Sequence, residues 1–332
     1  MTAPRVGLAL SGGGSKGAFT VGALKVVRQH LGLDAFAVIS GTSTGSLIGT
    51  MLTVDDWATL VNIYSKVTTK SIVNPHYPLV ADIAGPQSVL FAAALVGGRA
   101  IFDTAALKAT IKANVDFSAV KAAADKTLLY LNTVDLQTGE VVAFNNKDHS
   151  ATVLLNALMA SASMPVLMDP VEITLAGVTD QYVDGGVREF LPLGALFDSD
   201  VEVDYILAIS TAPIEAQKHP ARYDKITEIL ARTIELLDTE VGANDYFGSL
   251  EYDTILKMIE NAGSAGVSRT ALLKDIPDPV RKKLRDKRSV PVVLIAPDDH
   301  LHMDALTFEP AAMQGAMKLG TAAAKKALKA LP

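Results

Sequence analysis

The chain has 332 residues, of which 49% are hydrophobic and 20% are charged, as is typical of a globular protein. Its formal net charge of −6 argues against a general nucleic-acid-binding protein, and the absence of cysteine excludes disulfides, thiolate nucleophiles and cysteine-ligated metals. Because we find neither a signal-peptide pattern nor an apolar stretch long enough to span a bilayer, we expect a cytoplasmic protein.

Short apolar runs alternate with segments of helical periodicity along most of the chain. We predict strands over 6–10, 34–39, 127–134, 141–144, 181–184, 205–210 and 290–296. We predict one helix between the first strand and about residue 30. Further helices are predicted over about 44–52, 56–67, 104–114, 150–164 and at the C-terminus. Residues 223–262 are expected to form two helices. This alternation predicts an α/β fold in which helices cover both faces of a mostly parallel sheet.

The domain count is predicted to be one, because no repeat, low-complexity tract or linker interrupts the chain. We expect a motif-bearing core over about 5–210 and a C-terminal portion over about 211–332. The irregular apolar segment from Ser71 to Gly98, which is punctuated by proline and glycine, is a candidate lid or acyl-chain-binding loop. The alternative is a loop packed on the core.

Gly41-Thr42-Ser43-Thr44-Gly45 matches G-x-S-x-G between a predicted strand and a predicted helix. Gly41 and Gly45 permit the close backbone approach that a sharp strand-to-helix turn requires. The turn would place the Ser43 hydroxyl at a helix N-terminus, which favours negative charge. Ser43 is therefore a candidate nucleophile, and the alternative is a helix-capping serine.

Gly12-Gly13-Gly14-Ser15-Lys16-Gly17 satisfies G-x-G-x-x-G after the first strand, so a dinucleotide site is an alternative. Such a site predicts an acidic residue at the end of the second strand, where Ser40-Gly41 stand instead. A phosphate-binding P-loop fits less well, because Lys16 follows Gly12 too soon. The amides of the loop could instead form an oxyanion hole with the amide of Thr44.

A serine nucleophile needs a base, and two candidates follow it in the chain. A Ser–Asp–His order is present because Asp298-Asp299-His300 follows the last predicted strand, but the elbow comes much earlier here than in α/β-hydrolases. His300 and His302 could equally belong to a polar surface loop. We favour Asp184, which ends a strand and precedes Gly185-Gly186, and its alternative is an ordinary Asp-Gly turn.

These three motifs, G-G-G-x-K-G, G-T-S-T-G and D-G-G in that order, resemble the patatin-like phospholipase family. The segments Leu10–Phe19 and Ala160–Pro165 are similar as well, and the likeness extends from about Val6 to Ile209. The resemblance implies a three-layer α/β/α sandwich and lipid acyl hydrolase activity without metal or cofactor. It implies a Ser43–Asp184 dyad. It also implies an oxyanion loop of Gly12, Gly13 and Gly14, with Gly17, Gly41, Gly45, Gly185 and Gly186 as supporting glycines.

The sequence departs from the family at one position of the third motif. The family commonly continues as D-G-G-x-x-x-N-x-P, whereas this chain has Phe190 in place of asparagine, followed by Leu191 and Pro192. An asparagine side chain could hydrogen-bond to this turn, whereas a phenylalanine side chain cannot. The departure therefore affects how the loop that carries Asp184 is supported.

The expected partner is a lipid or fatty-acyl ester, with peripheral contact to a membrane and no nucleic acid. Lys16 is a candidate for binding a phosphate headgroup, and the basic residues between Arg281 and Arg288 could contact anionic lipid. Both features could also be solvated surface. The alternatives to a hydrolase are an acyltransferase on the same fold and a non-catalytic lipid- or nucleotide-binding module.

Overall fold

The computed structural model describes residues 4–32, 36–72, 74–75, 100–215, 218, 222–224 and 226–330. The expected lid or acyl-chain loop over 71–98 lies almost entirely outside these residues, so its role stays a prediction. Within the described ranges, no helix has both the length and the apolar character needed to cross a membrane.

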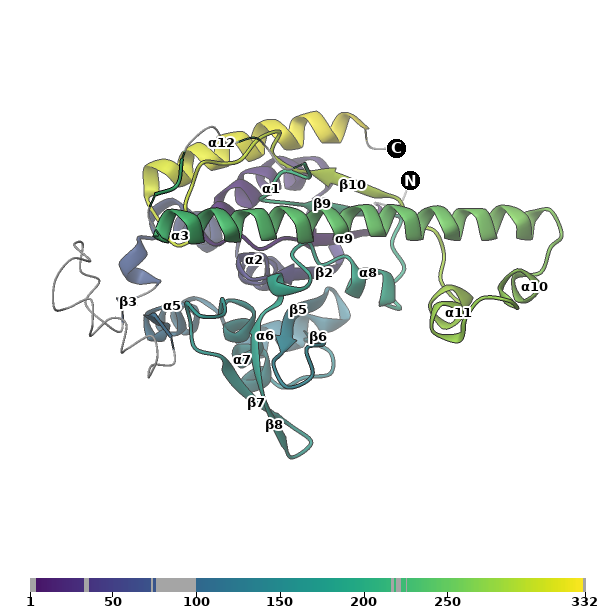
Figure 1. Ribbon diagram of the computed structural model, residues 1–332, viewed down its shortest axis with the longest axis horizontal. Coiled ribbons are helices and arrows are strands. Elements are labelled where there is room, and N and C mark those ends of the chain that lie inside the picture. Colours follow the sequence, from purple (N-terminus) through teal and green to yellow (C-terminus); the bar gives the residue numbers. More distant parts are fainter. Residues whose placement is uncertain are drawn as a thin grey trace.

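Eight strands of the described chain form one central sheet in the order β10-β9-β1-β2-β5-β8-β7, with β6 paired to β5 (Figure 1). The parallel part contains β10 (Val292–Ile295), β9 (Tyr205–Ile209), β1 (Val6–Leu10), β2 (Phe36–Thr42) and β5 (Leu128–Asp135). The antiparallel part contains β6 (Val141–Asn145), β7 (Val171–Leu175) and β8 (Val178–Asp184). A small separate sheet pairs β3 (Asn74–Pro75) with β4 (Phe102–Asp103). The mostly parallel sheet is confirmed, and β7 is a strand that the sequence analysis did not predict.

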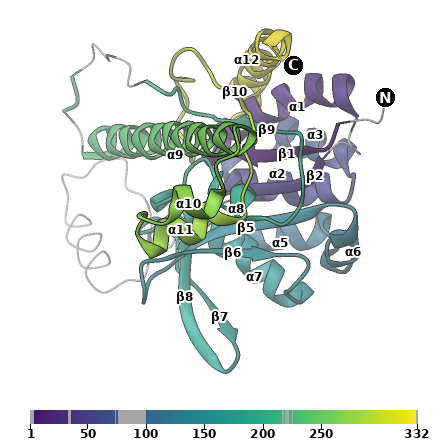
Figure 2. The same cartoon turned by 90° about the vertical axis from the view of Figure 1, so that its right-hand side faces the viewer.

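Helices cover both faces of the central sheet, which confirms the three-layer α/β/α arrangement (Figures 1 and 2). One face carries α1 (Gly17–Leu31), α2 (Thr44–Thr53), α3 (Trp57–Lys66), α5 (Ala105–Asn114), α6 (Phe117–Ala122), α7 (Ala151–Ser161) and α12 (Pro310–Ala327). The other face carries α8 (Gly194–Asp198), the chain on either side of it and part of α9 (Ile226–Ser264).

The strands divide their side chains between these two faces because successive residues of a strand point in opposite directions. Leu8 and Leu10 of β1 are fully buried in the larger core, under the helices of the first face. Ala9 between them belongs to the smaller core under α8, together with Val38 of β2. Near-continuous apolar strands of this kind are typical of a parallel sheet buried on both faces.

The C-terminal helix α12 packs directly on α1 (Figure 2). A Cβ atom at Gly320 would collide with the carbonyl of Phe19, and one at Gly22 would collide with the carbonyl of Met317. The two backbones therefore touch, and α12 is an integral layer of the molecule. The buried α12 residues Met313, Ala316 and Ala324 join the larger core.

The segment predicted as two helices is one helix, α9, of 39 residues. Glycine lowers helix stability by about 1 kcal/mol relative to alanine, and α9 contains Gly242 and Gly248. Tertiary contacts hold the helix through this region, because Gly242 is packed against Phe190 and Asp245 accepts a hydrogen bond from Leu191. The prediction of two helices was therefore wrong.

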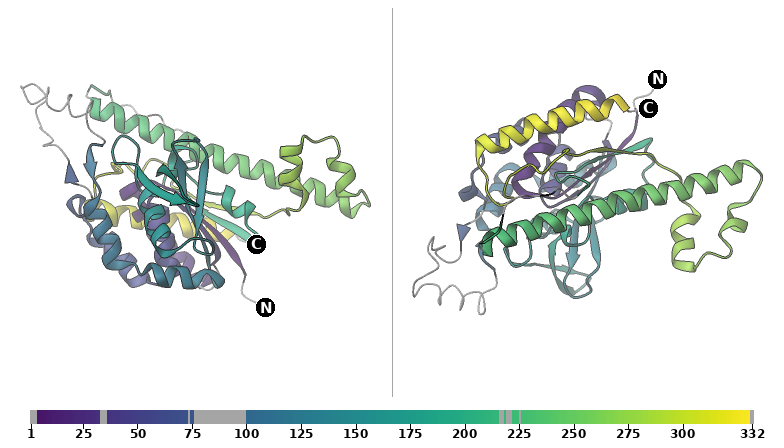
Figure 3. Two further views of the ribbon diagram at one scale, coloured as in Figure 1. Left: turned by 90° about the horizontal axis from the view of Figure 1, so that it is seen from below. Right: turned by 45° about the horizontal axis from the view of Figure 1, so that its top comes forward.

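The far end of α9 extends away from the sheet and is joined by α10 (Arg269–Leu273) and α11 (Asp278–Arg285), as Figures 1 and 3 show. Leu256 and Ile259 of α9 pack there with Leu273 and Leu284 in a small separate core. Asp253 connects this unit to the segment just before β10, since its Oδ1 accepts hydrogen bonds from the Ser289 hydroxyl and the Val290 amide at 2.6 and 2.7 Å.

Element boundaries differ from the predictions in two places that matter for the site. Strand β2 continues to Thr42, so the strand leads directly into the elbow. Helix α7 begins after its predicted cap, Ser150, but ends at Ser161, four residues before Pro165. The basic run from Arg281 to Arg288 is partly helical, because α11 includes its first half.

Candidate active site

Ser43 occupies a strained turn between β2 and α2. Its backbone has φ 55° and ψ −124°, a conformation that is costly for a residue with a side chain and is characteristic of functional turns. The side chain is not a helix cap, because it makes no hydrogen bond to the first turn of α2. Its hydroxyl instead lies near enough to the carboxyl group of Asp184 to lower the pKa of that group. The structure thus brings together the two residues expected to form a dyad.

The glycines beside Ser43 are required by close backbone packing. A Cβ atom at Gly45 would collide with the carbonyl of Leu10 at the end of β1. Side chains would likewise collide with neighbouring atoms at three of the other four supporting glycines, Gly17, Gly41 and Gly185, whereas a Cβ atom at Gly186 would lie 3.1 Å from Asp184 Oδ1. The elbow can therefore lie directly against the first strand and the first loop only because these positions lack side chains.

Asp184 is the last residue of β8 and precedes a short 3-10 turn, Gly185–Val187. Its Oδ1 accepts a hydrogen bond of 2.8 Å from the Gly186 amide, and only 4% of the residue is exposed. Burial raises the pKa of Asp184 to about 6, although hydrogen bonds from Gly186 and Ser43 act to lower it. This carboxyl group can therefore exchange a proton near neutral pH.

Strand β5 explains why these two residues meet although 141 positions separate them in the printed sequence. On one side β5 pairs with β2, with Asn132 opposite Thr42, and on the other its Thr133 lies opposite Asp184. The side-chain amide of Asn132 also donates hydrogen bonds to the Gly41 carbonyl at 2.8 Å and to a hydroxyl of β2. The ends of β2 and β8 are therefore fixed to the same strand.

The end of α7 supports both members of the pair through the main chain. The Ser161 hydroxyl accepts a hydrogen bond of 3.0 Å from the Ser43 amide and lies 2.8 Å from the Ser46 hydroxyl. The Ser163 carbonyl accepts a hydrogen bond of 2.9 Å from the Asp184 amide. The segment Ala160–Pro165, which resembles a family segment in the sequence, thus contacts both candidate catalytic residues.

The Gly12–Gly17 loop lies beside the elbow. A Cβ atom built on Gly12 would be 3.3 Å from the Cβ of Ser43, which shows how closely the two turns approach. The Gly12 amide donates to the Phe190 carbonyl at 3.1 Å, so it is already paired and does not fit the oxyanion role expected for it. The amides of Gly13, Gly14 and Thr44 have no acceptor among the described residues.

Lys16 does not face solvent. Its side chain is 8% exposed and its Nζ lies 4.0 Å from Oε1 of Glu235 on α9. His300 is also buried, with Nδ1 2.9 Å from the same carboxylate and Nε2 3.3 Å from Nη1 of Arg232. Both ring nitrogens of His300 therefore contact side chains of α9, which argues against a triad with Ser43. The surface-loop interpretation is correct for His302, which is 67% exposed, and wrong for His300.

Helix α9 contributes three carboxylates to this region that the sequence analysis did not identify. The pKa of Asp238 is raised to about 7, chiefly by burial. The nearby charge of Asp184 also raises this pKa, whereas the charge of Lys16 lowers it. Burial also raises the pKa of Asp245 to about 7, although the Leu191 amide that it binds lowers it. Glu235, Asp238 and Asp245 lie on one face of α9. The sequence does not reveal this shared face as long as the segment is interpreted as two helices.

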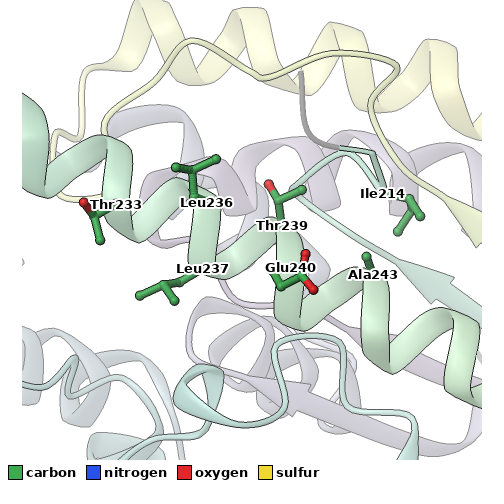
Figure 4. Close-up of a pocket in the computed structure, with 7 residues that line it drawn as sticks. All are labelled: Ile214, Thr233, Leu236, Leu237, Thr239, Glu240 and Ala243. Atoms are coloured by element: carbon green, nitrogen blue, oxygen red, sulfur yellow. The ribbon is translucent and has the colours of Figure 1, made fainter. Parts of the chain in front are cut away.

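A cavity of about 320 Å³ lies on another side of α9, between that helix and the chain after β9 (Figure 4). Its lining residues are Ile214, Thr233, Leu236, Leu237, Thr239, Glu240 and Ala243. Neither Ser43 nor Asp184 lines this cavity. It is therefore separate from the candidate catalytic pair, which is buried beneath the opposite side of the helix.

The basic run at α11 is partly neutralised within the chain. Arg281 forms an ion pair with Asp278, and Arg285 Nε lies 2.9 Å from Asp286 Oδ2. The Lys287 ammonium group donates to the Asp198 carbonyl at 2.8 Å. Contact of this run with anionic lipid stays a prediction.

Comparison with known proteins identifies the family. Residues 8–197 match the family model described as patatin-like phospholipase, which covers more than half of the chain and all three motifs. Among solved structures, VipD from Legionella pneumophila has a TM-score of 0.51 at 12% identity, over 99% of this chain and 67% of VipD. The ExoU–SpcU complex of the Pseudomonas aeruginosa type III secretion system has a TM-score of 0.31 at 17% identity, over 72% of this chain and 51% of the matched chain. Because the identity is low, the comparison with VipD shows only that the two folds are similar. The family model shows that this chain belongs to the patatin-like phospholipase family.

Proposed function

We propose that this protein is a serine lipid acyl hydrolase that uses Ser43 as nucleophile and Asp184 as base. The observation that carries the proposal is the proximity of the Ser43 hydroxyl, in a strained turn of a patatin-like fold, to the buried carboxyl group of Asp184. A serine hydroxyl becomes an effective nucleophile when an adjacent base accepts its proton. Asp184 is the group that the geometry offers for this task.

In the proposed reaction, Asp184 takes the hydroxyl proton while Ser43 Oγ attacks the carbonyl carbon of the ester. The oxygen of the tetrahedral intermediate is stabilised by amides of Gly13, Gly14 and Thr44, which have no acceptor in the described structure. The proton then moves to the leaving oxygen, and the alcohol or lysolipid departs. Water next attacks the acyl-enzyme and gives a proton to Asp184. Asp184 then passes this proton to Ser43 Oγ as the bond to the acyl group breaks, so the fatty acid leaves and both residues return to their starting states.

The pKa of Asp184, which burial raises to about 6, suits this role. A base with a pKa near the operating pH is largely deprotonated and still has substantial affinity for a proton. An ordinary surface aspartate would be a much weaker base. The proposal therefore connects the burial of Asp184 with its function.

The substrate class proposed is a phospholipid, lysophospholipid or simple fatty-acyl ester. Lys16 would contribute to headgroup binding only if substrate replaced its contact with Glu235. An acyltransferase would share every step up to the acyl-enzyme, and an acceptor alcohol would then take the place of water. Product analysis with and without an added alcohol separates the two.

Hydrolysis of p-nitrophenyl esters of graded chain length tests the proposal. We expect Ser43→Ala and Asp184→Asn to lower kcat by at least about 10³-fold, because each removes a group on which the proposed nucleophilic step depends. Ser118→Ala is the matched control, since Ser118 is an exposed serine on α6. Wild-type turnover by Ser43→Ala would refute the assignment of the nucleophile.

A further inference from the structure

The residues Glu189–Leu191 form a junction between the turns of the candidate active site. The Glu189 amide donates to the Gly185 carbonyl at 2.8 Å, which connects the junction to the Asp184 turn. The Glu189 carbonyl accepts a hydrogen bond of 2.9 Å from the Thr42 hydroxyl, next to Ser43. The Phe190 carbonyl accepts the Gly12 amide at 3.1 Å. A shift of this junction would therefore move the Asp184 turn, the elbow and the glycine loop relative to one another.

The side chains of the junction do not bind the Phe190 and Leu191 amides, since the Glu189 carboxylate accepts the Gly194 amide at 2.7 Å. Phe190 stands where the family motif commonly has asparagine, and its ring is fully buried against Gly12 and Gly242. The amides are bound from outside, by Asp245 on α9. The Leu191 amide donates to Asp245 Oδ2 at 2.8 Å, and the neighbouring Phe190 amide is near enough to lower the pKa of the same carboxyl group.

Helix α9 makes these contacts with a single face. Glu235, Asp238, Gly242 and Asp245 recur at intervals of three and four residues, so they lie along one side of the helix. Glu235 is near Lys16 of the glycine loop, and Gly242 and Asp245 contact the junction two turns further along. The face of α9 thus spans the two loops that flank Ser43.

We propose that Asp245 is a positioning residue, which holds the Glu189–Leu191 junction and thereby orients Asp184 and the glycine loop around Ser43. This inference rests on the proposed function. It explains how the third motif works here without its usual asparagine, because a carboxylate from the C-terminal third binds the same turn. Asp245 itself touches neither substrate nor the reacting atoms, and its effect is therefore on kcat.

The test compares Asp245→Ala, Asp245→Asn and the wild-type full chain. Glu251→Gln is the control because it removes a carboxylate from an exposed position of the same helix. Hydrolysis of p-nitrophenyl butyrate gives kcat and KM, and a fluorophosphonate gives the rate and final stoichiometry of Ser43 labelling. We expect Asp245→Ala to lower kcat by at least about tenfold with little change in KM, since misplacement of catalytic groups reduces rate. Labelling should be slower but reach full stoichiometry.

Asp245→Asn should recover most of the activity, because its amide oxygen can still accept the junction amides. Unchanged kcat in Asp245→Ala would overturn the proposal. The proposal would also be overturned if the final labelling stoichiometry fell in proportion to kcat. That result would mean that part of the protein is unfolded and that the catalytic groups of the folded part are not misplaced.

Hydrogen–deuterium exchange tests the same contact without any enzymatic readout. Peptides that contain Gly12 and residues 189–193 should exchange faster in Asp245→Ala than in wild type or Glu251→Gln. If wild type hydrolyses no ester but this exchange increases, the proposed function fails and the structural anchor stands. If exchange is unchanged, the anchor is wrong whatever the wild-type activity.

Discussion

At the scale of single residues, the reactive pair is held in conditions that are unfavourable for a charged group. Asp184 is almost completely buried, and the few hydrogen bonds it accepts lower its pKa by less than burial raises it. A proton-accepting carboxylate in such surroundings is a stronger base than one in water. The proposed chemistry therefore has a cost in stability, and that cost depends on pH.

The sign of this dependence follows from the two states of the protein. Asp184 has a pKa of about 6 when folded and an ordinary value of 3.8 when unfolded. Between these values the folded protein binds more protons than the unfolded one, so stability falls as pH rises and then levels off above pH 6. About two pKa units correspond to roughly 3 kcal/mol.

Asp184→Asn cannot ionise and should avoid this loss. We expect the variant to be inactive yet more heat-stable than wild type at pH 8, by several degrees in Tm, with little difference at pH 4. Thermal unfolding followed by circular dichroism across this pH range measures the effect. A difference in Tm that does not change with pH would show that Asp184 titrates normally in the folded protein.

At the scale of elements, helix α9 provides a direct test of packing against the catalytic loops. A Cβ atom at Gly242 would be 3.0 Å from Cδ1 of Phe190, whose ring is fully buried and has little space to move. At Gly248, on the same helix, a Cβ atom would meet nothing within 4 Å. The two glycines thus differ only in what lies next to them.

We expect opposite outcomes for the two alanine substitutions. Gly248→Ala should stabilise the protein by about 1 kcal/mol through helix propensity and leave kcat unchanged. Gly242→Ala should displace Phe190, lose that gain and lower kcat. Urea unfolding and ester hydrolysis measure both effects. Equal stabilisation and equal activity in the two variants would show that the contact between Gly242 and Phe190 is unimportant.

Sequence reasoning recovers the elements with strong local signals. Strands β1, β2 and β9 were predictable because each is a continuous apolar run, and α3 because Asp56 caps it. Strand β7 was missed because it lies on the sheet edge, where only Ile173 among its five residues is buried. The single helix α9 was missed because its continuity depends on tertiary contacts that are invisible in the sequence.

The residues of the candidate site likewise divide into those with a local sequence signal and those without one. Ser43 and Asp184 could be proposed as partners because each lies at the end of a strand within a glycine-containing turn, and the structure does bring them into contact. Asp245 could not be proposed, because nothing local distinguishes it from other acidic residues of α9. The sequence also could not show that the Gly12 amide is already paired with the Phe190 carbonyl. The catalytic roles themselves stay predictions.

At the scale of the whole molecule, the C-terminal third completes both the core and the site. The family model ends at residue 197, before β9, α9, β10 and α12. Yet α12 covers α1, and the Ala305 carbonyl accepts the Ser15 amide of the glycine loop at 2.8 Å. We therefore propose that the chain is one domain and that the motif-bearing part does not fold alone.

Truncation tests this proposal. A fragment of residues 1–215 should lack a cooperative thermal transition and should give poorly dispersed amide signals in NMR, because it lacks strand β10, helix α9 and the helix α12 that covers α1. The full chain should unfold in a single transition in calorimetry. Cooperative unfolding of the fragment near the Tm of the full chain would instead indicate an independent N-terminal domain.

The central claim is that Ser43 is the nucleophile activated by Asp184, and covalent labelling tests it most directly. The wild-type protein is treated with a fluorophosphonate and the adduct is located by peptide mass spectrometry. We predict one adduct per chain, on Ser43, formed much more slowly in Asp184→Asn and not at all in Ser43→Ala. An adduct on another residue, or undiminished labelling of Ser43→Ala, would contradict the account.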